Sequence, residues 1–375
     1  MTKPNLAIVS PIAGEETETF IKQHIKGLAI DFHFSGGDLP IELLYQNKKI
    51  TLGNGLSYQA FWSILKQVFR NKSISGPFIR NERFKSALRA YKIKILLLEY
   101  GPTAAACLPA CRDLGIPMIV FFHGFDVFSY EIIEKHKENY SKVAEYASSL
   151  FVVSESMKNK LVEIGLPPSK LTLNPCCPHP RFFSIKPDYS KRNIISVGRF
   201  VNKKAPYYNL YAFKLLLEKY PNAKFIFCGD GALFESCINL AKIWNIQHSV
   251  KFIGKVSSDT IFELMGNACM YIQHSVEALN GDSEGTPVAI LEAMAAGLAI
   301  ISTNHSGIAQ AVKDGVSGFL VEEHEVEKMA KKMIYLFDHP ELLKKMGENG
   351  RAIVKKKYDS TQHLNLIRRA VNDAL

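Results

Sequence analysis

Two glutamates separated by seven residues stand in one short stretch, GDSEGTPVAILEAMAAG (residues 281–297). Glu284 belongs to a polar, glycine-rich turn, whereas Glu292 is the only charged residue in the apolar run 287–296. A carboxylate among apolar side chains is unfavourable unless it has a partner. Because a carboxylate can accept hydrogen bonds from two neighbouring hydroxyl groups, both glutamates are candidates for binding a sugar ring.

The residues around Glu292 predict a helix over 287–296, with Thr286 as its N-cap, Pro287 at its first position and Gly297 just past its end. Free amides at the start of this helix would bind an anion, and we assign them to Gly285, Thr286, Pro287 and Val288. A sugar nucleotide carries a diphosphate between two polyhydroxyl rings. The predicted helix and the turn before it could therefore bind the diphosphate through the amides and one ring through each glutamate. The alternative is a surface helix with Glu292 exposed, and its apolar flanks count against this.

Basic and small residues follow two other strand-like runs. Gly198 and Arg199, then Lys203 and Lys204, come after NIISVG, where a planar guanidinium and a point charge would suit a diphosphate. A solvated basic turn is the alternative. The second run, KFIFCG, leads into Gly229, Asp230 and Gly231, which permit close approach of a ligand or simply a sharp strand-to-helix turn.

The first half of the chain offers a histidine and a tight turn. His123 follows the strand-like run IPMIVFF in the motif HGFD, which favours a functional imidazole at a sheet edge over a purely structural one. Asp126 could orient this imidazole or cap the next segment. The turn ending at Gly14 leads into a predicted helix, whose start would attract a phosphate.

Strands and helices alternate on both sides of a proline-rich segment, residues 174–192, which we interpret as a linker. Continuous apolar strands indicate parallel sheets covered on both faces. The strands are expected at 5–10, 93–99, 116–122, 149–154, 193–198, 224–229, 250–254, 269–273 and 298–302. We therefore expect an N-terminal domain over 1–180, a C-terminal domain over 181–355 and a final helix over 356–375 that could pack back on the N-terminal domain.

The net charge and the cysteine content restrict the partners and the cellular compartment that we expect for this chain. The net charge of +10 indicates an anionic partner. The seven cysteines are odd in number and form no CxxC pair, which disfavours a disulfide framework or a zinc site and favours a reducing cytoplasm. The N-terminus lacks a signal-peptide pattern, and no apolar run reaches the roughly 18 residues that a membrane span needs.

Positive charge gathers between Lys66 and Lys94, where nine basic residues face a single acid, Glu82. Aromatic residues, among them Phe61 and Trp62, precede this stretch. The segment Phe61–Lys94 would therefore suit an anionic membrane surface, and the acceptor would then be lipid-linked. The alternative places the aromatic residues in the core and the basic residues in solvent. No nucleic-acid recognition motif appears, so nucleic acid is not an expected partner.

Several motifs together resemble one family: VGR followed by KK, GDG, SEGTPVAILEAMAAGLAIIST, FVVSESMKNKLVEIG and HGFD. The chain resembles the retaining glycosyltransferases of family 4 over nearly its whole length, and in HSVEALNGDSEGTPVAILEAMAAG it resembles the subgroup that assembles bacterial surface polysaccharides. This resemblance implies an α/β chain of the GT-B fold, with two Rossmann-like, doubly wound domains facing each other across a cleft.

The resemblance also implies roles for matching residues. Glu292 would hold the donor ribose, Glu284 would contact the transferred sugar near its 3-hydroxyl, and Arg199 with Lys204 would neutralise the diphosphate. His123 would lie beside the donor sugar, and Gly14 would approach the phosphates or the acceptor. No metal or other cofactor is expected; Asp282-Ser283-Glu284 is the nearest approach to a metal-binding Asp-x-Asp. The single Gly14, and Ala205 where the family often has glycine, depart from the family pattern.

The expected reaction moves a hexose-type sugar from a nucleotide-sugar donor to a glycan or lipid-linked acceptor in polysaccharide synthesis. A UDP-sugar is favoured from family frequency, and retention would follow from attack on the leaving-group face. The enzyme would act in the cytoplasm, with the inner face of the membrane as a peripheral site. The alternatives are a sugar-nucleotide epimerase and a non-catalytic two-domain sugar-binding protein.

Overall fold

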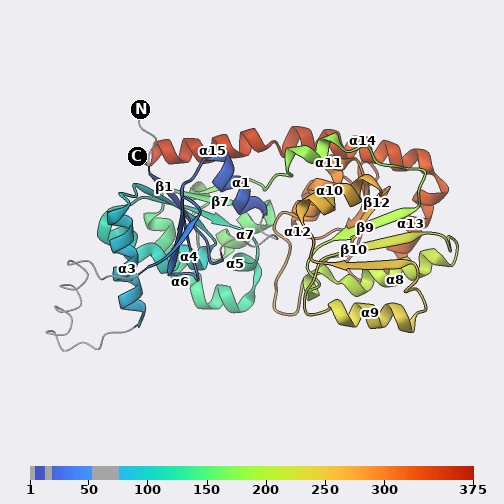
Figure 1. Cartoon of the computed structure of the whole chain (residues 1–375), viewed down its shortest axis with the longest axis horizontal. Coiled ribbons are helices and arrows are strands. Elements are labelled where there is room, and N and C mark those ends of the chain that lie inside the picture. The colour runs from blue at the N-terminus through green and yellow to red at the C-terminus, as the bar shows by residue number, and fades with distance from the viewer. Residues whose placement is uncertain (1–4, 13–18, 53–75) are drawn as a thin grey trace. The chain divides into compact units, whose positions relative to one another are not determined.

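A computed structural model describes residues 5–12, 19–52 and 76–375, which divide into two compact units (Figure 1). Unit 1 comprises Met1–Asn174 together with Leu364–Leu375, and unit 2 comprises Pro175–His363. The chain first passes between them inside the proline-rich segment interpreted as a linker. Each unit has its own sheet and its own hydrophobic core.

Unit 1 is built on a sheet with the strand order β4-β3-β2-β1-β5-β6-β7-β8. All neighbouring strands are parallel except β2–β3 and β3–β4. β1, β5 and β6 are buried along their whole length, which explains their unbroken apolar sequences. The strands are β1 (Leu6–Val9), β2 (Phe32–Ser35), β3 (Glu42–Tyr45), β4 (Lys48–Thr51), β5 (Ile95–Glu99), β6 (Met118–Phe122), β7 (Ser149–Val152) and β8 (Leu171–Leu173).

The β3–β4 hairpin was not predicted. Its two turn residues, Gln46 and Asn47, have φ values of 50° and 60°. Positive φ at both central residues gives a turn whose twist matches that of the strands. β4 reads KKIT and is mostly exposed, so it lacks the apolar run by which the other strands were found.

The helices of unit 1 are α1 (Thr19–Gly27), α3 (Gly76–Ala90), α4 (Gly101–Leu114), α5 (Phe125–Phe128), α6 (Tyr130–Tyr146) and α7 (Glu155–Glu163). Ordinary capping sets several of their bounds. The Ser154 side chain accepts a hydrogen bond from the Met157 amide at the start of α7. Gly115, with φ of 64°, ends α4 in the left-handed conformation.

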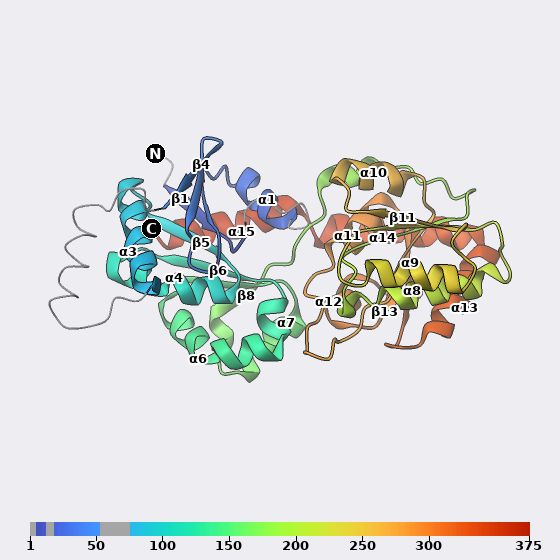
Figure 2. The same ribbon diagram turned by 60° about the horizontal axis from the view of Figure 1, so that its bottom comes forward.

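Unit 2 contains a six-stranded sheet, all parallel, in the order β11-β10-β9-β12-β13-β14. Figure 2 shows this sheet with α10 on one side and with α8 and α9 on the other. Strand order reverses between β9 and β12, and open parallel sheets bind ligands at such a point. The strands are β9 (Asn193–Val197), β10 (Lys224–Cys228), β11 (Val250–Gly254), β12 (Met270–Gln273), β13 (Ala299–Thr303) and β14 (Gly318–Val321).

Helices cover both faces of this sheet. Ile194 and Met270 belong to one core, with α8, α9 and α13, whereas Ile195 and Tyr271 belong to the other, with α10 and α11. This alternation along neighbouring strands is the period-two pattern of a sheet buried on both sides. The helices are α8 (Pro206–Leu217), α9 (Phe234–Ile243), α10 (Ser258–Gly266), α11 (Val288–Ala296), α12 (Ser306–Ala311), α13 (Val326–Asp338) and α14 (Pro340–Lys357).

The end of the chain differs from the single helix expected over 356–375. α14 ends at Lys357, and α15 (Ser360–Asp373) begins after a break. Asp359 accounts for the break, because its side chain accepts a hydrogen bond from the Gln362 amide, 2.8 Å away, and so caps α15. Residues from Leu364 onward belong to unit 1. None of the helices in the described part of the chain is both long and apolar enough to span a bilayer.

Candidate active site

The carboxyl ends of the strands carry the polar motifs in both units. In unit 2, Gly198 follows β9, Gly229 follows β10, and the loop to Glu284 follows β12. In unit 1, His123 follows β6. The sequence prediction that polar motifs would follow strands is thus confirmed, and the sheets bring residues far apart in sequence to common edges.

Glu284 is buried and pairs with Lys204, whose Nζ lies 3.0 Å from Glu284 Oε2. Among the described residues, Glu284 Oε1 has no hydrogen-bond partner. Burial opposes ionisation of this carboxyl, but Lys204 and Lys203 outweigh burial and hold its pKa below the ordinary value. Burial in turn lowers the pKa of Lys204, against the attraction of Glu284. The site therefore holds an ionised carboxylate with one free oxygen.

Lys203 does not share the role predicted for the basic pair. Its Nζ donates to Asp282 Oδ1 at 2.9 Å and to the Ser283 carbonyl at 3.2 Å. Lys203 is itself buried. Because its two hydrogen bonds go to Asp282 and Ser283, it fixes the loop residues that directly precede Glu284. Arg199, by contrast, is exposed, and no hydrogen bond or ion pair is found for its guanidinium within the described residues. Lys204 and Arg199 remain the cations available to an anion.

Gly198, Gly229 and Gly231 bring two loops into backbone contact. A Cβ atom at Gly229 would lie 1.8 Å from the Gly198 carbonyl oxygen, and one at Gly231 would lie 2.7 Å from the Phe200 carbonyl oxygen. Asp230 Oδ1 accepts from the Gly231 amide at 2.7 Å, so its side chain also shapes this turn. A hollow of only about 10 Å³ lies beside these loops, lined in part by Gly198, Arg199 and Lys204.

Glu292 lies on α11 and is buried, and the alternative of an exposed surface helix is therefore wrong. Its Oε1 has no partner among the described residues. Burial raises the pKa of Glu292 to about 8, against the opposing effects of Arg181 and a hydrogen bond from the His179 backbone. Arg181, which the sequence did not single out, also donates to Ser258 Oγ at 2.6 Å and pairs with Asp259.

The start of α11 differs from the prediction. The helix begins at Val288 and Pro287 takes the N-cap position, with no side-chain cap, so Thr286 is not the N-cap. Proline has no N–H, so Pro287 cannot donate to an anion. The predicted set of amides at this tip is therefore reduced to those of Gly285, Thr286 and Val288. Gly297 ends the helix with φ of 86°, as predicted.

His123 belongs to a buried network in unit 1. Its Nε2 lies 2.5 Å from Glu99 Oε2, and Glu99 Oε1 lies 2.6 Å from His24 Nδ1. The Phe20 ring stacks on His123 with the ring centroids 4.2 Å apart. Burial disfavours the charged form of Glu99, but His24 and His123 together lower its pKa to about 2. Glu99 and His24 were missed; the only available signal was a carboxylate ending the apolar run KILLLE.

The Asp126 carboxylate accepts hydrogen bonds from backbone amides and not from the imidazole of His123. The prediction that Asp126 orients this imidazole is therefore wrong. Its Oδ1 accepts from the amides of His123 at 3.0 Å and Gly124 at 2.9 Å, and its Oδ2 accepts from the Gly101 amide at 2.9 Å. Because these bonds reach the strand-to-helix turns after β5 and β6, Asp126 fixes the backbone that carries His123. Gly14 lies outside the described residues.

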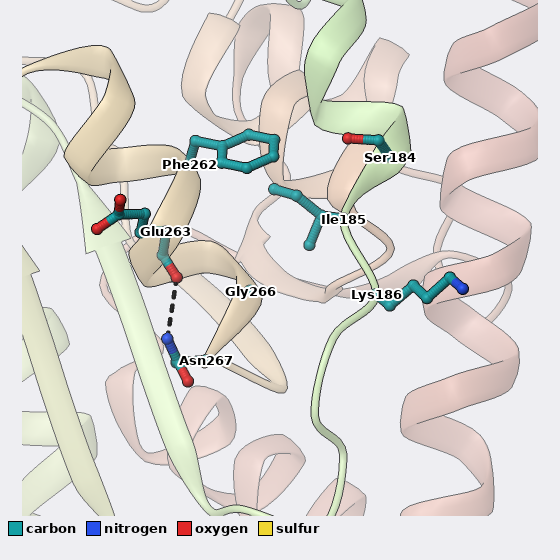
Figure 3. A pocket seen from close by; sticks show the side chains of 7 residues that line it. All are labelled: Ser184, Ile185, Lys186, Phe262, Glu263, Gly266 and Asn267. Carbon is teal, nitrogen blue, oxygen red and sulfur yellow. Dashed lines mark hydrogen bonds between the residues drawn. The ribbon is translucent and has the colours of Figure 1, made fainter.

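A hollow in unit 2 involves none of the predicted site residues. It has a volume of about 490 Å³, and Figure 3 shows it between Phe262 and Glu263 of α10 and the segment Ser184–Lys186. Gly266 and Asn267 complete its lining. Across the described part of the chain, no group of three or more His, Cys, Asp or Glu side chains is arranged to hold a metal ion.

Two family models match the chain. Residues 181–353 match the model described as glycosyl transferases group 1, and residues 55–177 match the model described as glycosyltransferase family 4. The two matches are separated by residues 178–180 and leave residues 1–54 and 354–375 uncovered.

Curated relatives point to polysaccharide synthesis. The amylovoran biosynthesis glycosyltransferase AmsK of Erwinia amylovora is 27% identical over 248 residues, covering 64% of this chain and 61% of AmsK. The putative colanic acid biosynthesis glycosyltransferase WcaL of Escherichia coli is 26% identical, covering 65% and 61% of the two chains. The matched region thus spans about 61% of the length of each relative.

Solved structures share the fold at low sequence identity. HepE of Anabaena, in complex with UDP and glucose, has a TM-score of 0.76 and 15% identity, covering 98% of this chain and 99% of HepE. The sucrose-phosphate synthase of Thermosynechococcus elongatus also has a TM-score of 0.76 and 15% identity, covering 99% and 98% of the two chains. The architecture of two Rossmann-like units is therefore common to all three.

Proposed function

The chain belongs to the family-4-like glycosyltransferases of the GT-B fold, and from this premise we propose that it transfers a sugar from a nucleotide-sugar donor to an acceptor during polysaccharide synthesis. The proposed acceptor is a glycan or a lipid-linked sugar. The proposed sugar is of the hexose type, and the proposed stereochemical outcome is retention.

A pair of buried carboxylates carries this proposal. Glu284 and Glu292 each leave one oxygen without a partner among the described residues, although buried oxygens are normally hydrogen-bonded. Hydroxyl groups of a ligand would satisfy both oxygens. Following the roles that the family resemblance implies, we assign Glu292 to the donor ribose and Glu284 to the transferred sugar.

Charge on the departing diphosphate is the main feature to be stabilised in such a reaction. Arg199 and Lys204 are the cations that we assign to it, with the amides of Gly285 and Val288. The loops containing Gly198, Gly229, Asp230 and Gly231 would let the phosphates approach the backbone closely. In this proposal side chains and amides supply the positive charge, and the reaction needs no metal.

The remaining parts of the proposal are the identity of the donor and the role of His123 in unit 1. A UDP-sugar is the favoured donor, and the fold shared with a protein solved with UDP and glucose is consistent with it. His123, held by Glu99, would lie beside the donor sugar. No side chain is assigned as a covalent nucleophile, so the acceptor would attack from the leaving-group face.

A peripheral position at the inner face of the cytoplasmic membrane remains part of the proposal. The residues proposed to contact lipid differ from those expected from the sequence. Residues 61–75 lie outside the described part. In α3, Lys85 is buried and pairs with Glu82 and with Asp113, 2.7 Å away, so it is not available to lipid. Arg80, Arg89 and Lys92 are exposed and are the better residues to test.

Donor-dependent transfer tests the function directly. Purified enzyme would be screened against nucleotide sugars by thermal shift, and the anomeric configuration of the product would be read by NMR. Glu284→Gln and Glu292→Gln should each lower transfer by at least about tenfold, because Glu284→Gln removes a charge-assisted contact and Glu292→Gln replaces a carboxyl oxygen with an amide NH2 that cannot accept a hydrogen bond. The exposed Glu263→Gln should not lower transfer. Full activity in both site variants would contradict the assignment, and an inverted product would contradict retention.

A further inference from the structure

The peptide groups of Glu284 are held from both sides by a single neighbouring turn. The Glu284 amide donates to His305 Nε2 at 3.2 Å, and Ser306 Oγ donates to the Glu284 carbonyl at 2.6 Å. Both partners lie where β13 leads into α12, away from the β12 loop that carries Glu284. The position of the Glu284 backbone therefore depends on a second strand end.

The bond from Glu284 fixes the state of the His305 ring. A backbone amide can only donate, so Nε2 must carry a lone pair and the ring proton must be on Nδ1. His305 Nδ1 lies 2.6 Å from Glu323 Oε1, which accepts this proton. Glu323 Oε2 in turn accepts from the Glu277 amide at 2.9 Å. The His305 ring is thus neutral, in one tautomer, and its side chain is only 4% exposed.

We propose that His305 is a positioning residue for Glu284, acting only as the neutral tautomer that Glu323 selects, and that Ser306 assists it. The inference rests on the proposed function, in which Glu284 contacts the transferred sugar. Protonation of Nε2 would place one N–H against another, the hydrogen bond would be lost, and Glu284 would move. Loss of this hydrogen bond should therefore lower the rate of transfer.

The β12 loop has a separate anchor, which makes the role of His305 testable without unfolding. Lys203 holds Asp282 and the Ser283 carbonyl, and Thr303 Oγ1 donates to the Ser275 carbonyl at 2.6 Å. Loss of the His305 bond should leave this loop folded and displace mainly Glu284. A displacement of about 1 Å in a catalytic group can lower a rate by about a hundredfold.

Two variants at position 305 distinguish a positioning role from simple filling of space. His305→Leu removes the hydrogen-bond acceptor and should lower kcat between about tenfold and about a hundredfold, with little change in the donor KM. His305→Gln keeps an acceptor near the Nε2 position, so it should restore most of kcat. A wild-type kcat in His305→Leu would overturn the proposal.

Hydrogen–deuterium exchange of the segment 282–288 supplies a readout independent of activity. The Glu284 amide should exchange faster in His305→Leu than in the wild type, and close to the wild-type rate in His305→Gln. The exposed His248→Leu of the same unit is the control and should change nothing. Unchanged exchange in His305→Leu would contradict the positioning of the Glu284 backbone by His305. If exchange is faster but the wild-type enzyme transfers no sugar, the positioning by His305 is supported and the proposed function is rejected instead.

Discussion

Burial of the Glu292 carboxyl makes the stability of the fold depend on pH. Its pKa, which burial raises to about 8, exceeds the ordinary value of 4.5, so the folded state holds a proton that the unfolded state has lost between these pH values. Stability therefore falls as pH rises from about 4.5 to about 8. The loss has an upper limit of several kcal/mol, at about 1.4 kcal/mol per pH unit.

Glu292→Gln should remove this pH dependence. The free energy of unfolding of the variant, relative to wild type, should increase by up to several kcal/mol between pH 5 and pH 8.5, while affinity for the nucleotide sugar decreases. Chemical denaturation at both pH values measures the first effect, and calorimetric titration measures the second. Glu263→Gln, which alters an exposed carboxylate, controls for charge. A constant difference across pH would show that Glu292 is ionised in the folded state.

Glu99 has the opposite linkage. Because His24 and His123 hold its pKa at about 2, Glu99 contributes stability that is present above about 4.5 and is lost as pH falls toward 2. Glu99→Gln should lower the free energy of unfolding of unit 1 at pH 7 by up to roughly 3 kcal/mol. The difference from wild type should shrink below pH 4, as followed by urea denaturation. The exposed Glu138→Gln should show no such pattern, and an equal loss at pH 3 and pH 7 would contradict the ion network.

The residues predicted from the sequence are those whose motif lies in one stretch. Glu284 and Glu292 could be found because their spacing and apolar context are local, and the structure confirms that Glu292 is buried. Glu99 and His305 could not be found in this way. Each acts through a partner brought in by another strand, and no local pattern marks such a pair.

At the scale of elements, the contact between the loops after β9 and β10 leads to a direct test. Gly229 has φ of 131°, and an added Cβ would lie 1.8 Å from the Gly198 carbonyl oxygen, which belongs to backbone and cannot rotate away. Gly254 also has positive φ, 77°, but an added Cβ there would have nothing within 4 Å. A comparison of alanine substitutions at Gly229 and Gly254 therefore distinguishes the effect of a steric clash from the effect of backbone strain.

Gly229→Ala should therefore destabilise unit 2 far more than Gly254→Ala. Strain alone costs about 1–2 kcal/mol for a left-handed residue, which is the loss expected at Gly254. Gly229→Ala should exceed this by a further few kcal/mol, since the two loops must separate, and should weaken donor binding as well. Differential scanning calorimetry of the two variants decides this; similar melting temperatures would contradict the backbone contact.

The sequence predicted the strands inside each sheet better than the strands near the sheet edges. The nine predicted strands correspond to strands of the structure with small shifts at their ends. The strands missed were β2, β3, β4, β8 and β14. β3 and β4 form the hairpin at one edge of their sheet, and β8 and β14 are edge strands as well. Edge strands are often short and partly exposed, as β4 is, which weakens the apolar signal. β2 is buried and is not an edge strand, but His33 and Ser35 interrupt its apolar sequence.

At the scale of the whole molecule, alternating strands and helices were sufficient to predict two Rossmann-like units. The assignment of the last residues to a unit was not predictable from periodicity. A helical pattern reports which face is apolar and not which core receives it. Leu364–Leu375 belongs to unit 1, although the residues just before it belong to unit 2.

The contacts of this terminal segment are specific. Leu364 packs so closely that a Cβ on Gly27 would lie 2.4 Å from its Cδ1. Arg368 Nη2 donates to the Gly27 carbonyl at 2.7 Å. Ile367 and Val371 are buried. The last turns of α15 therefore complete the core of unit 1 with side chains that the first 174 residues do not supply.

Removing this segment should destabilise unit 1 selectively. A chain ending at His363 loses several buried apolar side chains, each contributing about 1.5–3 kcal/mol, or on the order of 5 kcal/mol together. For a unit of this size that corresponds to a fall of roughly 10 °C or more in Tm. Calorimetry should show one transition shifted and the other, from unit 2, nearly unchanged. A chain ending at Asp373 keeps all these contacts and should melt like the full chain. Equal shifts of both transitions in the shorter chain would show that α15 stabilises the two units together.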